Sequence, residues 1–399
     1  MAWRRITRCM RHDLVELFRC PRCTAPLRLL HEARGFDLRG ARHVVDGVLT
    51  CASDHRWPIL DEVPRLLLQP LMTPEEIACL ESAPPPGGSV SIVPMILSDR
   101  QIETEIERTV RNGYGASPEP GTAARRRADR EVEYAVAEFN GLNKRKYVPL
   151  VKGRLAARPN RLLDVGGDLG ATGRCFARAL GARDTVVVDL NIGNQHAFKT
   201  ADRGLCLVRA DAQNLPFPDR AFDLVVSAFL LEHVPDWRRA ASEMMRVGAA
   251  CFIAFGPNRW FPYEIGHIDA PLAGTLPKPV AKYVAFAWLW LTRQGRTLKR
   301  IEESLAEVTF ISSVSFRRHC RRESRSPVNL LPRLVEAVVR DRQAPPTAMR
   351  RLVRGLGAVA PLFAGALAGA GLEPQMYYFI PPPAPATGRL GTVDTSPGR

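Results

Sequence analysis

The residues Leu162–Gly170 (LLDVGGDLG) constrain the fold more than any other segment of this chain. An apolar run ends in Asp164 and passes directly into a glycine-containing turn, which a helix-length segment follows. Glycine lets a ligand approach the backbone closely, and open α/β sheets bind ligands beyond the carboxyl ends of their strands. The segment therefore predicts an α/β fold with a ligand site at this turn.

Strand-like and helix-like segments alternate from Arg161 onward. This alternation indicates a parallel sheet that is covered by helices on both faces. The predicted strands are Arg161–Val165, Thr185–Asp189, Leu205–Arg209, Phe222–Ser227, Ala250–Phe255, one near Thr309–Phe316, and Met376–Ile380. We therefore expect one doubly wound, Rossmann-like sheet of seven strands.

Changes in composition divide the 399 residues into predicted segments. These are a small β module (1–70), a linker with a helix (71–124), the main α/β domain (125–383, with a substrate-side insertion at about 257–300) and a disordered tail (384–399). Pro- and Gly-rich stretches mark the linker. Two further helices are predicted, near Asp99–Arg111 and near Glu131–Phe139.

The composition excludes several classes of protein. With 46% hydrophobic residues, 24% charged residues and nine cysteines, the chain is neither disordered, nor fibrous, nor a disulfide-stapled miniprotein. Sparse cysteines and an N-terminus without an apolar signal run predict a cytoplasmic location. The formal net charge of +15 fits an anionic partner such as nucleic acid, a membrane surface or a phosphorylated substrate, and fits GC-rich codon bias equally well.

Two apolar stretches raise the question of membrane contact. A spanning helix needs roughly 20 apolar residues, so Pro279–Leu291 is too short, and Gly355–Leu372 is too rich in Gly and Ala. We expect helices packed on a soluble domain. The alternative is a surface helix that places Trp288 and Trp290 in a lipid interface, which would suit a lipid-like substrate.

Acidic residues end three successive predicted strands. Asp164 ends the first, Asp189 ends the second, where it can accept hydrogen bonds from ribose hydroxyls, and Asp211 with Ala212 follows the third, where they can meet an adenine edge. A dinucleotide site needs G-x-G-x-x-G against a pyrophosphate, which the carboxylates at this turn would repel. Acids favour instead the sulfonium and ammonium groups of S-adenosylmethionine. Asp168 is expected to cap the following helix.

Three motifs carry a family resemblance. The segments LLDVGGDLG (162–170), VVVDLN (186–191) and RADAQNLPFPDRAFDLVVSAFLLEHVPDW (209–237) resemble the class I S-adenosylmethionine-dependent methyltransferases, in particular the ubiquinone/menaquinone-biosynthesis branch. The resemblance covers Arg161–Phe255 and continues more loosely to Ile380. It implies a Rossmann-like transferase (EC 2.1.1.-). The chain departs from the family at Asp168, where a glycine is usual.

The resemblance also implies which residues surround the cofactor. The methionine side is assigned to the turn after the first strand, the ribose to the end of the second, the adenine to the end of the third, and the floor beneath the methyl group to the end of the fourth. The implied cofactor-binding residues are Asp164, Gly166, Gly167, Gly170, Asp189, Leu190, Asp211, Ala212, Ser227 and Phe229.

The N-terminal module contains a candidate zinc site. A tetrahedral zinc site takes four ligands from two short knuckles, and here Cys20, Cys23 and Cys51 supply three. Asp54 stands where a fourth cysteine would fall, and His55 is the alternative. A ribbon that has lost its metal and is held by apolar packing is the other possibility.

The same module resembles a small zinc-ribbon protein that activates tRNA and protein methyltransferases in eukaryotes and archaea. The resemblance rests on the cysteine spacing and on the segment WPILDEVP (57–64). It implies a lid or docking module for the catalytic domain. A structural appendage is the alternative.

Candidate catalytic residues follow the fourth and fifth predicted strands. They are His233, in LEHV, and the pair Glu264 and His267. Histidine moves protons near neutral pH, although His233 could instead line the pocket. Glu264 and His267 are three residues apart, so that they would share a face if this segment were helical, and they could abstract a proton or bind a metal. Methyl transfer itself needs mainly alignment and exclusion of water, and a base only where the acceptor must lose a proton.

The long aromatic insertion predicts a capped, largely apolar pocket. We therefore predict a methyltransferase that acts on a small-molecule or lipid-like acceptor, on oxygen, in a bacterial biosynthetic pathway. A tRNA or protein methyltransferase is the first alternative, favoured by the ribbon resemblance and the net charge of +15. A non-catalytic S-adenosylmethionine-binding protein is the second.

Overall fold

The computed structural model describes most of the chain. The described residues are 5–6, 10–36, 42–60, 62–81, 89–91, 93–94, 144–168, 170–191, 205–292, 296–340 and 359–383, with a few single residues between 104 and 136. The predicted helices near Asp99–Arg111 and Glu131–Phe139 fall almost entirely outside these residues. The predicted tail, 384–399, lies wholly outside them.

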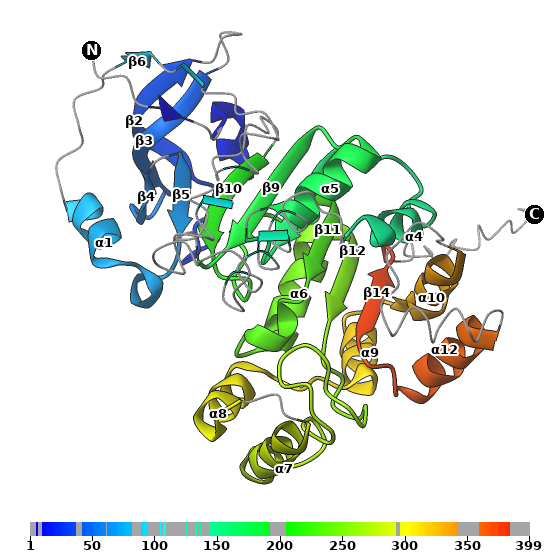
Figure 1. Cartoon of the computed structure of the whole chain (residues 1–399). Helices are drawn as coiled ribbons and strands as arrows, with labels where there is room; N and C mark the ends of the chain where they lie inside the picture. Colours follow the sequence, from blue (N-terminus) through cyan, green and yellow to red (C-terminus); the bar gives the residue numbers. More distant parts are fainter. Residues whose placement is uncertain are drawn as a thin grey trace, which may run out of the picture.

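A mostly parallel sheet forms the centre of the molecule (Figure 1). Its strands are β8 (Arg161–Val165), β9 (Asp184–Asp189), β10 (Leu205–Ala210), β11 (Phe222–Ala228), β12 (Gly248–Phe255), β13 (Val328–Asn329) and β14 (Met376–Ile380). They lie in the order β13-β14-β12-β11-β8-β9-β10, and β14 runs antiparallel to β12. The predicted Rossmann-like α/β fold is therefore confirmed, with crossovers that place β8 near the middle.

One predicted strand is wrong. The segment Thr309–Phe316 contains coil and the first turn of α9 (Ser313–Arg322), and the edge strand is β13 instead. Ser312 is the reason, because its hydroxyl accepts a hydrogen bond from the Ser315 N–H at 3.1 Å and so caps the helix. The β-branched residues around Ser312 are typical of a strand, but the cap starts a helix at this point.

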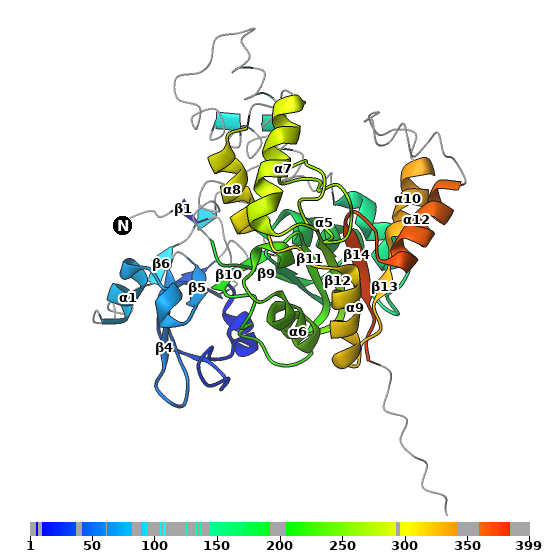
Figure 2. The ribbon, with the colours of Figure 1, turned by 90° about the horizontal axis from the view of Figure 1, so that it is seen from below.

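Helices cover both faces of the sheet (Figure 2). Buried side chains of α4 (Val148–Lys152), α5 (Ala171–Leu180), α10 (Leu331–Arg340) and α12 (Val359–Ala370) pack on one face. Those of α6 (Trp237–Val247) and α9 pack on the other. The end of α5 follows from its sequence, since Gly181 adopts φ +72 there and so supplies the left-handed cap that other residues resist.

The N-terminal module extends the central sheet. Its described elements are η1 (His12–Leu17), β2 (Arg28–Phe36), β3 (Arg42–Thr50), β4 (Arg56–Leu60), β5 (Val63–Leu66), α1 (Pro74–Glu81) and β6 (Ser89–Ser91). β5 pairs in parallel with β10, so that twelve strands form one sheet within the described residues. The prediction that the sheet consists of seven strands is therefore wrong, because the module adds its own strands to it.

A single hydrophobic core crosses the junction between the module and the main sheet. Buried Met10, Phe18 and Leu66 belong to the same cluster as Val208 and Phe217. The rings of Phe18 and Phe217 are 6.1 Å apart. The module is therefore packed against the β10 edge of the sheet.

A small cap follows β12. The helices α7 (Lys278–Leu291) and α8 (Leu298–Glu307) pack against each other and against buried residues of the preceding loop, such as Ile268. Figure 1 shows the pair set apart from the sheet layers. Among the described helices, which include most of both apolar stretches, none has the length and hydrophobicity needed to cross a membrane.

Candidate functional site

The turn after β8 closes tightly around a buried carboxylate. Asp164 is 1% exposed, and its Oδ2 accepts the Gly173 N–H at 2.6 Å. A Cβ on Gly167 would lie 2.6 Å from Cγ1 of Val187, and Gly166 adopts φ +71. The turn therefore needs glycine at both positions, one for space and one for conformation.

The residue that departs from the family pattern, Asp168, connects the turn to a neighbouring strand through its backbone. α5 begins after Gly170, which has no side chain that could cap the helix. The Asp164 carboxylate takes that place through the Gly173 N–H. Asp168 adopts φ +45 and donates its backbone N–H to Oδ2 of Asp189 at 3.0 Å. This bond ties the turn to the end of β9.

The second acid sits at the end of β9. Oδ1 of Asp189 accepts the Asn191 N–H at 2.8 Å, so that each carboxylate oxygen already has one backbone donor. A carboxylate oxygen has lone pairs for two donors. Asp189 can therefore still accept hydrogen bonds from two ligand hydroxyls. Leu190, beside it, is 44% exposed and offers an apolar surface at this edge.

The third acid follows β10. Oδ1 of Asp211 accepts the backbone N–H of Gln213 at 2.8 Å, which forms a tight turn next to the buried Ala212. Because β8, β9 and β10 are neighbours in the sheet, Asp164, Asp189 and Asp211 lie along one edge. The structure thus brings together the acids that the sequence singled out.

The end of β11 adjoins the glycine turn. Ser227 is fully buried, and Phe229 adopts φ +61. The Leu230 side chain lies against Gly166, where an added Cβ would come within 2.7 Å of it. Lys144 places its Nζ 5.2 Å from the centre of the Phe229 ring. Lys144 was not predicted, because it belongs to no motif and only the fold brings it here.

The predicted catalytic residues lie together beyond β11 and β12. His233 follows β11, and its ring centre is 5.3 Å from that of His267. Glu264 and His267 lie in a loop and not on a helix, and this loop wraps around the Glu264 carboxylate. That carboxylate accepts the N–H groups of His267, Ile268 and Asp269 at 3.1, 2.6 and 2.9 Å, and contacts Nδ1 of His267 at 3.0 Å.

Glu232 completes this group and was not predicted. It is 1% exposed, and no described side chain donates a hydrogen bond to its carboxylate, which only the backbone N–H groups of Glu232 and Gly256 approach. Burial raises the pKa of Glu232 to about 7 and lowers that of His233, whereas the hydrogen bond to Glu264 raises the pKa of His267. Its position directly before His233 was visible in the sequence, but its burial was not.

Comparison with known proteins identifies the domain that carries this site. A family model described as a methyltransferase domain matches residues 163–250. Residues 163–250 are thus similar to a methyltransferase domain. Over 102 residues the chain is 38% identical to the ubiquinone/menaquinone biosynthesis C-methyltransferase UbiE of Stutzerimonas stutzeri, which covers 23% of this chain and 39% of that protein.

Two further similarities are weaker or equally local. The UbiE of Vibrio parahaemolyticus is 37% identical over 23% of this chain and 38% of its own length. The chain thus spans well under half the length of these curated relatives. A solved complex of the Haloferax volcanii Trm112 methyltransferase activator with a putative methyltransferase has a TM-score of 0.36 and 14% identity, over 62% of this chain and 95% of that one.

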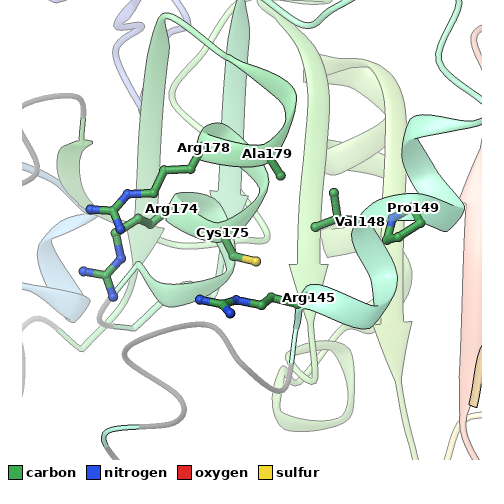
Figure 3. Close-up of a pocket in the computed structure, with 7 residues that line it drawn as sticks. All are labelled: Arg145, Val148, Pro149, Arg174, Cys175, Arg178 and Ala179. Atoms are coloured by element: carbon green, nitrogen blue, oxygen red, sulfur yellow. The ribbon is translucent and has the colours of Figure 1, made fainter. Parts of the chain in front are cut away.

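A separate pocket lies on the methyltransferase domain between α4 and α5 (Figure 3). Its cavity volume is about 400 Å³, and Arg145, Arg174 and Arg178 surround Cys175 there. Burial raises the pKa of the Cys175 thiol. None of the predicted cofactor or catalytic residues lines this pocket, so it is distinct from the site at the strand ends.

The cysteines of the N-terminal module converge on a histidine. The ligand atoms of Cys20, Cys23, Cys51 and His55 all lie within 4.8 Å of one another. The Cys23–Cys51 Sγ distance is 3.7 Å, and Nδ1 of His55 is 3.5 Å from the Sγ atoms of Cys20 and Cys51. Tetrahedral zinc with bonds of about 2.3 Å to sulfur and 2.0 Å to nitrogen requires separations of about 3.8 and 3.5 Å. The four side chains therefore fit zinc.

Asp54, which was predicted as the fourth ligand, lies outside this cluster. Its side chain is 71% exposed and pairs with Arg56 at 3.1 Å. Asp54 adopts φ +56, which turns the chain so that His55 faces the cysteines instead. The alternative ligand named from the sequence, His55, is the one that the structure favours.

The buried Asp164 makes stability depend on pH. Burial raises its pKa from 3.8 to about 7, so the folded state binds this proton more tightly than the unfolded state. The free energy of unfolding should therefore fall as the pH rises from about 4 through 7, by on the order of 2–4 kcal/mol at about 1.4 kcal/mol per unit. Urea unfolding at pH 5, 6, 7 and 8 should show this decline.

A variant isolates the contribution of Asp164. In Asp164→Asn the decline with pH should become shallower, because the amide does not titrate, while other buried acids such as Glu232 keep part of it. Asp219→Asn, at an acid with a 77% exposed side chain, is the control and should preserve the wild-type slope. Equal slopes in all three proteins would contradict the assignment to Asp164.

Proposed function

We propose that this protein transfers a methyl group from S-adenosylmethionine to an oxygen of a small-molecule or lipid-like acceptor. The observation that carries the proposal is the edge formed by Asp164, Asp189 and Asp211 around a turn that excludes side chains. The acids suit a ligand with an ammonium group, a sulfonium centre and ribose hydroxyls. The methionine part would lie at Gly166–Gly170, and the ribose at Asp189.

The proposed reaction is an in-line displacement. The acceptor oxygen attacks the methyl carbon, the carbon–sulfur bond breaks, and sulfur keeps the electron pair, which gives neutral S-adenosylhomocysteine. Positioning and exclusion of water supply most of the catalysis. The acceptor hydroxyl must also lose its proton, and the group formed by Glu232, His233 and His267 is where we place that step, because it adjoins Leu230 at the glycine turn. The pathway is proposed to be a bacterial biosynthetic one.

The N-terminal module is proposed to bind zinc through Cys20, Cys23, Cys51 and His55 and to stabilise the methyltransferase domain. Its strand β5 continues the sheet at β10, where Arg65 pairs with Arg209 in register. The methyltransferase domain thus gains a covered sheet edge in place of exposed backbone groups. A docking role for the module follows from this continuous sheet.

Replacing Asp189 by Ala should weaken the binding of S-adenosylmethionine at least tenfold, or about 1.4 kcal/mol. The reason is the loss of the carboxylate that would accept the ribose hydroxyls and that also holds the Asp168 N–H. Calorimetric titration of the full chain measures the change. Asp219→Ala, at an exposed acid distant from this edge, should bind as the wild type does.

Two results would count against the proposed function. No binding of S-adenosylmethionine to the folded wild type would overturn it. Methylation at carbon would be the second such result, and mass spectrometry of the product distinguishes it from methylation at oxygen. A carbon product would favour the activity for which the UbiE relatives are named.

A further inference from the structure

We propose that Glu232, His233 and His267 bind a divalent first-row transition-metal ion that coordinates the acceptor of the methyl group. This inference deepens the proposed function and rests on it. One ligand atom from each side chain lies within 4.8 Å of the others. The site is separate from the cysteine cluster and has a different ligand chemistry.

Both imidazole rings are oriented in the way that metal-binding histidines are. Nδ1 of His267 contacts the Glu264 carboxylate at 3.0 Å, and Nδ1 of His233 contacts the Glu307 carbonyl oxygen at 3.4 Å. A ring that donates its Nδ1 hydrogen to such an acceptor keeps its Nε2 lone pair for a metal. Each ring thus has an outer partner, one carboxylate and one backbone carbonyl.

The outer partner of His267 is itself held firmly. Glu264 is 2% exposed, and the N–H groups of His267, Ile268 and Asp269 donate to its two oxygens. These bonds satisfy a buried negative charge and fix the carboxylate beneath the ring. Three backbone hydrogen bonds to one carboxylate fix the conformation of this loop, which therefore holds His267 in a single orientation.

The third ligand explains an otherwise costly feature. Both carboxylate oxygens of Glu232 are buried, no described side chain donates a hydrogen bond to them, and only the backbone N–H groups of Glu232 and Gly256 approach them. A buried charge that is so weakly paired is unfavourable. A divalent cation at this point would neutralise it. Two histidines with one carboxylate form the ligand set of catalytic zinc sites and of mononuclear iron sites, both of which keep open coordination positions.

The place of this group in the fold gives the ion a task. Glu232 and His233 follow Leu230, which contacts Gly166 of the cofactor turn, while Glu307 ends the cap helix α8. An ion here would lie between the cofactor turn and the cap. Metal binding lowers the pKa of a coordinated hydroxyl, so that the acceptor proton passes to solvent water before the oxygen attacks the methyl carbon.

The separations of the three ligand atoms are close to those that a bound ion would impose. Bonds of about 2.0–2.2 Å place two ligand atoms of one ion at most about 4.4 Å apart. The ligand atoms lie within 4.8 Å of one another, so that binding requires at most a movement of some tenths of an ångström at the side-chain ends. His233, on the exposed side of the group, can supply it by rotation.

Cobalt(II) is the probe, because it reports both its stoichiometry and its ligands. The metal-free full chain should bind two equivalents, one with intense thiolate charge-transfer absorption from the cysteine cluster and one with only weak visible bands. His267→Ala should lose the second equivalent and keep the thiolate absorption. His319→Ala is the matched control, since His319 pairs with Ser242 on α6 away from this group, and it should bind two equivalents.

A second variant protects the test against misfolding. Glu264→Gln should weaken binding of the second equivalent by about 10–100-fold, as loss of an outer partner does. Circular dichroism of each variant checks its fold, and Glu232→Gln replaces His267→Ala if that variant is unfolded. The proposal is overturned if the wild type binds one equivalent only, or if His267→Ala and Glu232→Gln still bind two.

Calorimetry keeps the two proposals apart. Binding of S-adenosylmethionine together with a single cobalt equivalent overturns the metal site and leaves the proposed function standing. Two cobalt equivalents without binding of S-adenosylmethionine overturn the proposed function. The metal site would then still be supported as a site, and its assignment to the methyl acceptor would fall.

Discussion

Replacing Cys51 by Ser is expected to abolish zinc binding by the N-terminal module and to lower the free energy of unfolding by at least about 3 kcal/mol. Cys51 contacts two other members of the cluster, Cys23 at 3.7 Å and His55 at 3.5 Å. Structural zinc contributes about 10–16 kcal/mol in peptides that have no other core. The effect here should be smaller, because Phe18, Leu49 and other buried residues also hold the module.

The measurement combines metal analysis with unfolding. Purified wild type should contain zinc at the cysteine cluster, and Cys51→Ser should lack it and unfold at a lower urea concentration. Cys79→Ser is the control, because Cys79 is a half-buried free cysteine outside the cluster. A wild type that keeps its stability after chelation of all metal would show that the ribbon is held by apolar packing alone.

Prediction succeeded where the residues of a short segment determine its local structure by themselves. The strand and turn at Leu162–Gly170 follow from local patterning, because an apolar run, an acid and two glycines are needed within one turn. The same holds for Asp189 and Asp211, since each follows its own strand and neighbouring parallel strands end at one edge. Local patterning and the rules of parallel sheets are therefore enough to place these residues together.

Prediction failed where a single residue decides between two local structures. The segment around Ser312 has strand-like composition, but its hydroxyl caps a helix. Asp54 and His55 are adjacent, and a positive φ at Asp54 selects the histidine. In each case the deciding hydrogen bond or dihedral angle leaves no periodic trace in the sequence.

Other features could not be predicted because they join distant segments. Glu232 is buried by loops that arrive from residues 256–269 and from α8, so its neighbours in the chain say nothing of its surroundings. The pairing of β5 with β10 likewise depends on a contact between the two parts of the chain. Such contacts are known only once the fold is known. The group formed by Glu232, His233 and His267 and the continuous sheet both depend on them.

Replacing Glu76 by Ala is expected to lower the free energy of unfolding by about 3–5 kcal/mol, the usual cost of leaving a buried charge without its partner. Glu76 lies on α1 and is 3% exposed. Its carboxylate accepts hydrogen bonds from Arg209 of β10 and lies 3.7 Å from Arg65 of β5. The Arg209 side chain is only 13% exposed, so its charge would lose this partner in a place that water scarcely reaches.

The position of Glu76 makes this variant a test of the joint between the module and the methyltransferase domain. Besides the two arginines, Glu76 accepts the Thr73 N–H at 2.8 Å and so also caps α1. Glu76→Gln keeps an acceptor for that N–H and removes only the charge, so its loss should be intermediate. Glu75→Ala, one residue earlier and exposed, should lower the urea midpoint far less than Glu76→Ala does, because Glu75 contacts neither arginine.

The shape of the unfolding curve carries the second part of the prediction. If the shared sheet holds the module to the methyltransferase domain, the wild type should unfold in one transition, and Glu76→Ala should separate the module into an earlier one. Cobalt absorption of the cysteine cluster then follows the module, while circular dichroism follows the whole chain. Coincident curves for Glu76→Ala, at the wild-type midpoint, would show that this carboxylate does not hold the two parts together, and that the buried contacts around Phe18 and Phe217 suffice.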